Sequence, residues 1–315
     1  CASSSADGYI KLWNVQDSWT TPPPDGSGKK RYDDTKRDGG DDTDANRKDG
    51  HSLEPSVTCG GHTRGINDIA WNPVSPFLAS ASDDKTVRLW DMVTGDALVE
   101  YRGHDSFVFC VDQYQHMIVS GSFDETVKLW DIRSGDCVST LPAHSDPVTS
   151  VSFNRDGTVV CTGSHDGLIR LWDVATGECL KTIYAAGNPP VCSAKFSPNS
   201  KYILAGTLMD ATLRLWPVAR TGSNLCSKTY KSQHHVNVKY SIVADFTYDG
   251  NVLTGSETGK VILYDLQSQD VLQVLEAHED AVLAVSAHDK LPLLASGAMM
   301  NDRRVHFWAP KDFLF

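Results

Sequence analysis

Aspartate and histidine, which serve in proton transfer and metal binding, recur at fixed positions along the chain. An aspartate stands six residues before an aromatic residue in six of seven copies: Asp7, Asp84, Asp124, Asp166, Asp210 and Asp302; Thr258 breaks the series. Upstream of four copies a histidine follows a small residue: His62, His104, His144 and His278. A single Asp–His pair would suggest a catalytic dyad. Because no nucleophile is distinguished from its copies, we expect structural networks in which Asp, His, a Ser or Thr and Trp hydrogen-bond in series.

Other signatures of catalysis are absent from the sequence. It has no phosphate-binding glycine loop, metal-ligand cluster or lone nucleophile–base pair. The eight cysteines are scattered without a C-x-x-C pair, which favours reduced intracellular thiols. We therefore predict a protein that is not an enzyme and that needs no cofactor and no metal.

Charge and hydropathy exclude further classes of function. The 29 basic and 40 acidic side chains give a net charge of −11, which is the wrong sign for neutralising phosphates. No apolar run approaches the roughly 18 residues of a membrane helix. Hydrophobic residues at 40% are enough for a sizeable core. We expect a globular chain without a nucleic-acid or membrane partner.

The aromatic residues define an internal repeat. They are spaced 77, 40, 42, 44, 48 and 44 residues apart, at Trp13, Trp90, Trp130, Trp172, Trp216, Tyr264 and Trp308. Between them the chain alternates in short strands, four per unit, separated by Asp, Gly and Asn turn residues. Units of 40–45 residues with Gly-His and Trp-Asp signatures are typical of WD-repeat blades. The sequence therefore predicts an all-β fold, a seven-bladed WD-repeat β-propeller around a central channel.

The long first interval indicates an insertion in the first blade. Residues 17–51 contain the run TTPPPDGSGKKRYDD and few apolar side chains, too few to offset the entropy of ordering. We predict a partial first blade at 1–16, a disordered insertion at 17–51 and the remaining blades at 52–315, in one propeller domain. The insertion is either a solvated loop or a contact for a partner.

Both ends of the repeat array are predicted to be incomplete. The chain begins in register with the second strand of a unit, so the innermost strand of the first blade is missing. Seven residues follow Trp308, too few for the outer strand of the last blade. We expect a segment outside these residues to complete the ring.

The opening of the channel is the first candidate binding site. The fifth residue after a blade histidine should line it, which places Asn67, Phe109 and Thr149 there. Turns between second and third strands add Asp83, Phe123 and His165. An acid beside an aromatic ring suits an arginine or lysine of a partner. The alternative is that Phe109 only plugs the channel.

Several stretches resemble a particular family. SGSFDETVKLWD, LPAHSDPV, SHDGLIRLWD and PPVCSAKFSPNSKYIL are similar to the WD-repeat subunit of COMPASS and mixed-lineage-leukaemia type histone lysine methyltransferases. In that family an arginine enters the channel between two phenylalanines beside a rim acid. The resemblance implies that Phe109 is the first phenylalanine and Asp83 the rim acid. Three positions depart from the pattern, namely Val243 for the second phenylalanine, His165 for a rim tyrosine and Asn67 for a channel serine. Further implied positions at the opening are Phe123, Pro147, Cys192, Tyr240 and Ser241.

The same resemblance implies a second site on the opposite face, in a cleft between the fifth and sixth blades. It would dock an acidic and hydrophobic segment of another subunit. The positions it implies are Asn199, Tyr202, Leu215, Phe246, Tyr248 and Gln267. For Leu215 and Phe246 the alternative is that they belong to the blade core.

The function implied is that of a non-catalytic scaffold and peptide-binding subunit of a histone lysine methyltransferase complex. We expect protein partners (the methyltransferase, other subunits and a histone tail), a monomeric chain within a hetero-complex, and a nuclear location, with a cytoplasmic one as the alternative. The other class of function is a WD-repeat adaptor in another assembly, such as a ubiquitin-ligase substrate receptor, a splicing particle or a cilium component.

Overall fold

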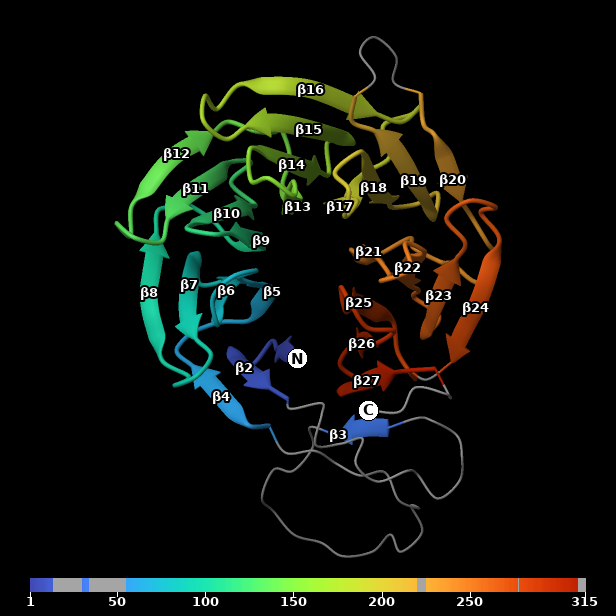
Figure 1. The fold of residues 1–315 in the computed structure, drawn as a ribbon, viewed down its shortest axis with the longest axis horizontal. Coiled ribbons are helices and arrows are strands. Elements are labelled where there is room, and N and C mark those ends of the chain that lie inside the picture. Colours follow the sequence, from blue (N-terminus) through green and yellow to red (C-terminus); the bar gives the residue numbers. More distant parts are fainter. Residues whose placement is uncertain (14–29, 34–54, 220–224, 277, 311–315) are drawn as a thin grey trace, which may run out of the picture.

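Seven antiparallel sheets surround a central channel (Figure 1). The structure is a computed structural model that describes residues 1–13, 30–33, 55–219, 225–276 and 278–310. Those residues form strands and turns only. None of them belongs to a helix long and apolar enough to span a bilayer. The predicted seven-bladed all-β propeller is confirmed.

Six of the seven blades consist of four strands, and the first consists of three. Blade 1 contains β1 (Ala2–Ser4), β2 (Tyr9–Leu12) and β4 (Val57–Gly60). Blade 2 contains β5 (Ile66–Trp71), β6 (Phe77–Ser82), β7 (Thr86–Asp91) and β8 (Ala97–Arg102). Blade 3 contains β9 (Val108–Tyr114), β10 (Met117–Ser122), β11 (Val127–Asp131) and β12 (Cys137–Leu141). Blade 4 contains β13 (Val148–Phe153), β14 (Val159–Ser164), β15 (Leu168–Asp173) and β16 (Cys179–Tyr184).

The remaining blades follow the same order from the channel outwards. Blade 5 contains β17 (Val191–Phe196), β18 (Tyr202–Thr207), β19 (Thr212–Pro217) and β20 (Lys228–Tyr230). Blade 6 contains β21 (Ala244–Phe246), β22 (Val252–Gly255), β23 (Lys260–Tyr264) and β24 (Val271–Glu276). Blade 7 contains β25 (Val282–Ala287), β26 (Leu294–Ala298), β27 (Arg304–Trp308) and β3 (Lys30–Asp33).

The hydrophobic core lies between the blades. Trp130 of blade 3 packs with Leu89 and Tyr101 of blade 2, and Trp172 of blade 4 packs with Leu129 of blade 3 in the same way. These indoles are at most 7% exposed. A single blade could not bury both of its apolar faces, so each blade depends on its neighbours.

Side chains on the innermost strands connect adjacent blades along the channel. The Asp112 carboxylate on β9 accepts the N–H of Phe153 on β13 at 2.8 Å, and Asp68 on β5 accepts that of Val111 on β9 at 3.0 Å. Between blades 5 and 6 the connection is an ion pair, in which Lys195 Nζ lies 2.6 Å from Asp245 Oδ1. These polar contacts fix the innermost strands relative to one another.

The last blade differs from the prediction. Its outer place is taken by β3, whose four residues lie within the range predicted to be disordered (17–51), and it pairs antiparallel with β27. Tyr32 lies opposite Val305, the register that Tyr101 and Val87 have in blade 2. The prediction of an incomplete last blade is therefore wrong. Residues 30–33 form a strand in the structure, whereas the sequence predicted disorder over 17–51, and the rest of 17–51 lies outside the described residues.

The two faces of the ring are defined by their turns. The upper face carries the turns between second and third strands, such as 83–85, and the segments that enter the innermost strands, such as 103–107. The lower face carries the turns between first and second strands, such as 72–76, and those between third and fourth strands, such as 92–96. The first candidate site lies on the upper face and the second on the lower.

Candidate functional site

The recurring aspartates and histidines form a hydrogen-bonded network in four blades. In blade 3, His104 Nδ1 lies 2.9 Å from Asp124 Oδ2, His104 Nε2 lies 2.8 Å from Ser120 Oγ, and Trp130 Nε1 donates to the same hydroxyl at 2.8 Å. The other networks are His62–Asp84–Ser80–Trp90, His144–Asp166–Thr162–Trp172 and His278–Asp302–Ser296–Trp308. The predicted Asp–His–Ser/Thr–Trp networks are confirmed.

The donors in each network determine the tautomer of its histidine. An ionised carboxylate can only accept, so His Nδ1 carries a proton and donates it to the aspartate. In a neutral ring Nε2 is then an acceptor for the hydroxyl, which itself accepts from the Trp N–H. Both ring nitrogens of each network histidine are therefore engaged in structural hydrogen bonds.

The networks also control the protonation of their members. Burial acts to raise the pKa of Asp84, but hydrogen bonds from Thr86, His62 and the Thr63 N–H outweigh it and lower that pKa to about 2. Burial lowers the pKa of His62 despite the neighbouring Asp84 carboxylate. At neutral pH the pair is therefore a neutral imidazole and a carboxylate.

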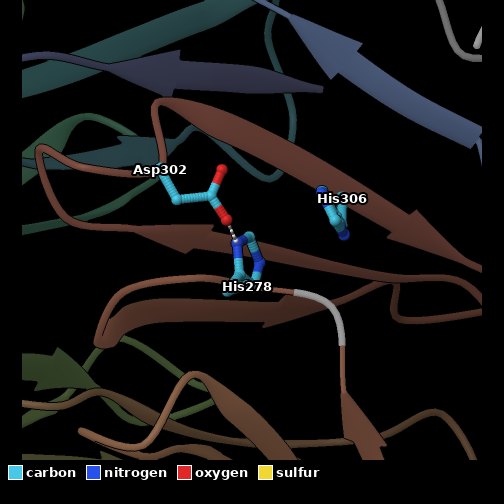
Figure 2. Close-up of side chains that lie close together, drawn as sticks. All are labelled: His278, Asp302 and His306. Carbon is cyan, nitrogen blue, oxygen red and sulfur yellow. Dashed lines mark hydrogen bonds and ion pairs between the residues drawn. The ribbon is translucent and has the colours of Figure 1, made fainter. Parts of the chain in front are cut away.

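A second histidine accompanies the network in blade 7. Figure 2 shows His278, Asp302 and His306, whose donor atoms all lie within 4.8 Å of one another. The rings of His278 and His306 are stacked, with centroids 4.3 Å apart and planes 29° apart. A metal ion lies near the plane of each imidazole that binds it, and nearly parallel stacked rings offer no such shared point. In this conformation the cluster is a structural network with a stacked histidine.

Blades 5 and 6 replace the network by other contacts. In blade 5, Arg214 donates to Thr207 Oγ1 at 2.9 Å and to Asp210 Oδ2 at 2.5 Å. In blade 6, where Thr258 occupies the aspartate position, Glu257 Oε1 accepts the N–H groups of residues 238–240. The turns on the upper face of both blades are therefore held by different residues.

An aromatic cluster lies at the channel mouth, which we define as the opening of the channel on the upper face. The rings of Phe109 and Phe123 meet edge to face, with centroids 5.9 Å apart, and Phe107 lies 6.4 Å from Phe123. Phe109 is half-buried, and Phe123 is 50% exposed. The guanidinium of Arg64 lies 5.9 Å from the Phe107 centroid, so one cation of the chain itself already contacts this cluster.

Polar residues predicted at the channel mouth are bonded to the channel wall. Asn67 Nδ2 donates to Asp83 Oδ1 at 2.7 Å and to the Val108 carbonyl at 2.9 Å. Thr149 Oγ1 donates to the Val191 carbonyl at 2.7 Å. Asp83 is thus oriented by Asn67, one of the three positions that depart from the family pattern.

The other predicted residues at the channel mouth differ in exposure. Val243 is 42% exposed, whereas Cys192 is 2% exposed and accepts a hydrogen bond from Asn237 Nδ2 at 3.3 Å. Burial lowers the pKa of His165, although the nearby Asp146 acts to raise it. His165 and Ser241 are exposed, and Pro147 and Tyr240 are half-buried. Cys192 is therefore too deeply buried to contact a partner directly.

Acidic side chains outnumber basic ones around the upper face. The acids outside the networks include Asp7, Asp83, Asp105, Glu125, Asp146, Glu279 and Asp280. The bases are Arg64, Lys85, Lys231, Lys239 and Arg303 among the described residues of these turns. The excess negative charge favours a basic partner.

On the lower face, the predicted cleft residues fall into two groups. Leu215 and Phe246 are 3% and 8% exposed and belong to the core shared by blades 5 and 6, as the alternative reading expected. Tyr248 is 52% exposed, Asn199 and Gln267 are exposed, and Tyr202 is half-buried. The six positions implied for the cleft therefore include both surface residues and core residues.

A lysine holds the lower face of blades 5 and 6 together. Lys228 Nζ donates to Gln267 Oε1 at 2.9 Å and to the carbonyls of Leu266 and Gln267 at 2.9 and 2.8 Å. The exposed Lys201 and Tyr248 belong to the same lower face of blades 5 and 6. Two lysines and an exposed tyrosine on one face suit an acidic and apolar segment.

Some residues of the site were not predicted from the sequence. Phe107 stands two residues before Phe109, and in an extended segment this spacing predicts that both side chains lie on the same side. Glu257 stands directly before Thr258, the position at which the aspartate series is interrupted. That interruption is a sequence signal for a substitute carboxylate at Glu257. Lys195 and Asp245 have no such signal because their ion pair joins strands 50 residues apart.

The family model "WDR5 beta-propeller domain" matches residues 42–309. The chain belongs to the WDR5 beta-propeller family. Propellers of this family are generally non-catalytic scaffolds that bind protein partners.

Relatives of this WDR5-type propeller are diverse. The chain is 29% identical over 249 residues to Periodic tryptophan protein 2 of Arabidopsis thaliana, and the match covers 78% of this chain and 25% of that protein. It is 43% identical over 54 residues to Denticleless protein homolog of Danio rerio, covering 17% and 8%. It is 49% identical over 47 residues to the probable cytosolic iron-sulfur protein assembly protein Ciao1 of Culex quinquefasciatus, covering 15% and 14%. The chain thus spans a quarter or less of the length of these relatives.

The half-buried Asp68 gives this WDR5-type propeller a testable pH dependence. Burial and the nearby Asp112 raise the pKa of Asp68 from 3.8 to about 7, against the hydrogen bonds from the Val111 and Ile69 N–H groups. Between pH 3.8 and about 7, the Asp68 carboxyl is therefore protonated in the folded state and ionised in the unfolded state. The contribution of Asp68 to stability therefore falls as pH rises from about 4 to 7.

We expect Asp68→Asn to gain in thermal midpoint relative to wild type across that pH window, because the amide still accepts from Val111 and carries no charge. Asp68→Ala should be less stable than Asp68→Asn throughout, since the Val111 N–H then loses its acceptor. Calorimetry between pH 4 and 8 measures both. A difference between Asp68→Asn and wild type that does not change with pH would contradict the raised pKa.

Proposed function

We propose that this chain is a non-catalytic scaffold and peptide-binding subunit of a histone lysine methyltransferase complex. The observation that carries the proposal is the aromatic cluster of Phe107, Phe109 and Phe123 at a channel mouth surrounded by acidic side chains. The family resemblance of the sequence adds the identity of the complex. A scaffold of this kind would act in the nucleus; the alternative is a cytoplasmic adaptor.

The first ligand in this proposal is an arginine-containing segment of the methyltransferase or of a histone tail. Phe109 would stack on the guanidinium, and Asp83 would contact the peptide at the rim. Val243 provides an aliphatic surface where the family has the second aromatic ring. Stacking on one ring instead of two weakens arginine binding by about 1 kcal/mol.

The second ligand is an acidic and apolar segment of another subunit, bound on the lower face by Tyr202, Tyr248 and Gln267. Lys228 and Lys201 supply the complementary charge. Exposed tyrosines give contact area at a low cost in side-chain entropy. The two faces together would let the ring hold two partners at once.

A second class of function has support from the relatives. They include the Denticleless homolog, a probable iron-sulfur protein assembly protein, and WD repeat-containing protein 26 homolog of Drosophila melanogaster. The same ring can therefore be an adaptor in another assembly. Co-purification from native cells separates the two, since a methyltransferase and its core subunits are expected for the first, and ligase, splicing or other assembly proteins for the second.

The channel mouth is tested by titrating a labelled arginine-containing tail peptide. Phe109→Ala should weaken binding by about fivefold to tenfold through loss of the cation–π contact. Val243→Phe should tighten it by restoring a second aromatic face. Tyr248→Ala, on the other face, is the matched control and should bind like wild type. Equal affinities of wild type and Phe109→Ala would remove this site from the proposal.

The lower face is tested by capture of an acidic and apolar peptide. Tyr248→Ala should reduce capture at least fivefold, because the tyrosine provides contact area there, and Phe109→Ala should leave capture unchanged. The thermal midpoint of Tyr248→Ala should stay within about 2 °C of wild type, since half of its side chain is exposed. A large loss of stability with unchanged capture would show that Tyr248 belongs to the core instead.

A further inference from the structure

The segment that enters blade 6 is longer than its counterparts. Residues 231–243 separate β20 from β21, whereas residues 103–107 separate β8 from β9. The segment passes beside the channel mouth, where Val238 is 55% exposed and Val243 is 42% exposed. A longer segment needs more contacts to hold one conformation.

In four other blades the network aspartate holds this segment. Its Oδ2 accepts the N–H of the residue after the histidine, at 3.1 Å for Thr63, 2.9 Å for Asp105, 3.4 Å for Ser145 and 3.0 Å for Glu279. Blade 6 has Thr258 in place of this aspartate. Its hydroxyl cannot accept several N–H groups as a carboxylate does.

Glu257 supplies the missing carboxylate from the preceding position. Its Oε1 accepts three consecutive backbone N–H groups, from Val238 at 2.8 Å, Lys239 at 2.5 Å and Tyr240 at 3.0 Å. Consecutive N–H groups that converge on one point form an anion-binding nest. Hydrogen bonds to a carboxylate are stronger than those to a neutral acceptor.

Further contacts fix the part of the same loop that directly precedes Val238. The Glu257 N–H donates to the Val236 carbonyl at 3.0 Å, and the Val236 N–H donates to Ser256 Oγ at 3.0 Å. Asn237 is buried, and its carbonyl accepts the N–H of Met209 of blade 5 at 3.0 Å. The loop therefore contacts blade 5 through the backbone and side chain of Asn237, and contacts Glu257 over three residues.

We propose that Glu257 is a positioning residue for the channel mouth. Its carboxylate fixes the backbone of residues 238–240 and thereby places Tyr240 at the opening, whereas Val243 is held by its own N–H, which donates to the Leu283 carbonyl of blade 7 at 2.9 Å. It touches no ligand itself and acts through this loop. The effect on binding rests on the proposed function of the channel mouth, whereas the effect on the loop does not.

The first test measures hydrogen exchange of the Val238, Lys239 and Tyr240 amides in the full chain. Glu257→Ala should speed their exchange at least tenfold, and Glu257→Gln, which keeps one acceptor oxygen, should give a smaller change. Acetate at about 100 mM should restore protection in Glu257→Ala when chloride of equal ionic strength does not, because a small carboxylate can occupy the nest. Glu279→Ala removes an acidic side chain of the same face at a distance in sequence and is the matched control.

The second test measures the affinity of the arginine-containing peptide. Glu257→Ala should weaken binding by about fivefold, with a thermal midpoint close to that of Glu279→Ala, and acetate should restore part of the affinity. Unchanged amide exchange in Glu257→Ala would overturn the inference. If the wild type binds the peptide, faster amide exchange in Glu257→Ala with an unchanged peptide affinity would also overturn it. Faster exchange, with a wild type that binds no such peptide, would support the anchor and contradict the proposed function.

Discussion

A single hydroxyl group joins the parts of each regular blade. Ser120 accepts from Trp130 and donates to His104, which in turn donates to Asp124, so four segments of blade 3 meet in one series of hydrogen bonds. The carboxylate then holds the turn on the upper face and the segment that enters the innermost strand. Because the buried polar groups in the series are paired with one another, the network stabilises a buried polar region and gives the upper face a fixed shape.

The fixed upper face explains how the ring can serve as a platform. A rigid scaffold positions its turns, and the turns carry the residues that differ between blades. Phe123 lies directly before the network residue Asp124, and Asp83 lies directly before Asp84. The residues that would meet a partner are therefore held by structural residues one position away. Blades 5 and 6, which lack the network, use Arg214 and Glu257 instead. The segment that enters blade 6 also carries the aliphatic Val243 at the channel mouth.

The features that recur from blade to blade could be predicted from the sequence, whereas the features that occur in a single blade could not. Asp84, Asp124, Asp166 and Asp302 could be placed in turns because their spacing to the tryptophan is constant. The strand Lys30–Asp33 could not, because four charged and polar residues between Pro, Gly and Asp have no apolar period, and only the free outer edge of β27 selects them. Leu215 and Phe246 occur at cleft positions in the sequence, but the packing between blades 5 and 6 buries them. Their burial depends on a neighbouring blade that the local sequence does not contain.

The tautomers of the four network histidines test this account most directly. Long-range nitrogen–proton spectra of the folded protein identify which ring nitrogen carries the proton in His62, His104, His144 and His278. The account predicts a proton on Nδ1 in all four, since the carboxylate can only accept, and a neutral ring at neutral pH in His62 and His278, whose pKa values burial lowers. A bare Nδ1 in any of the four, or a proton on Nε2 of His62 or His278 at neutral pH, would contradict it.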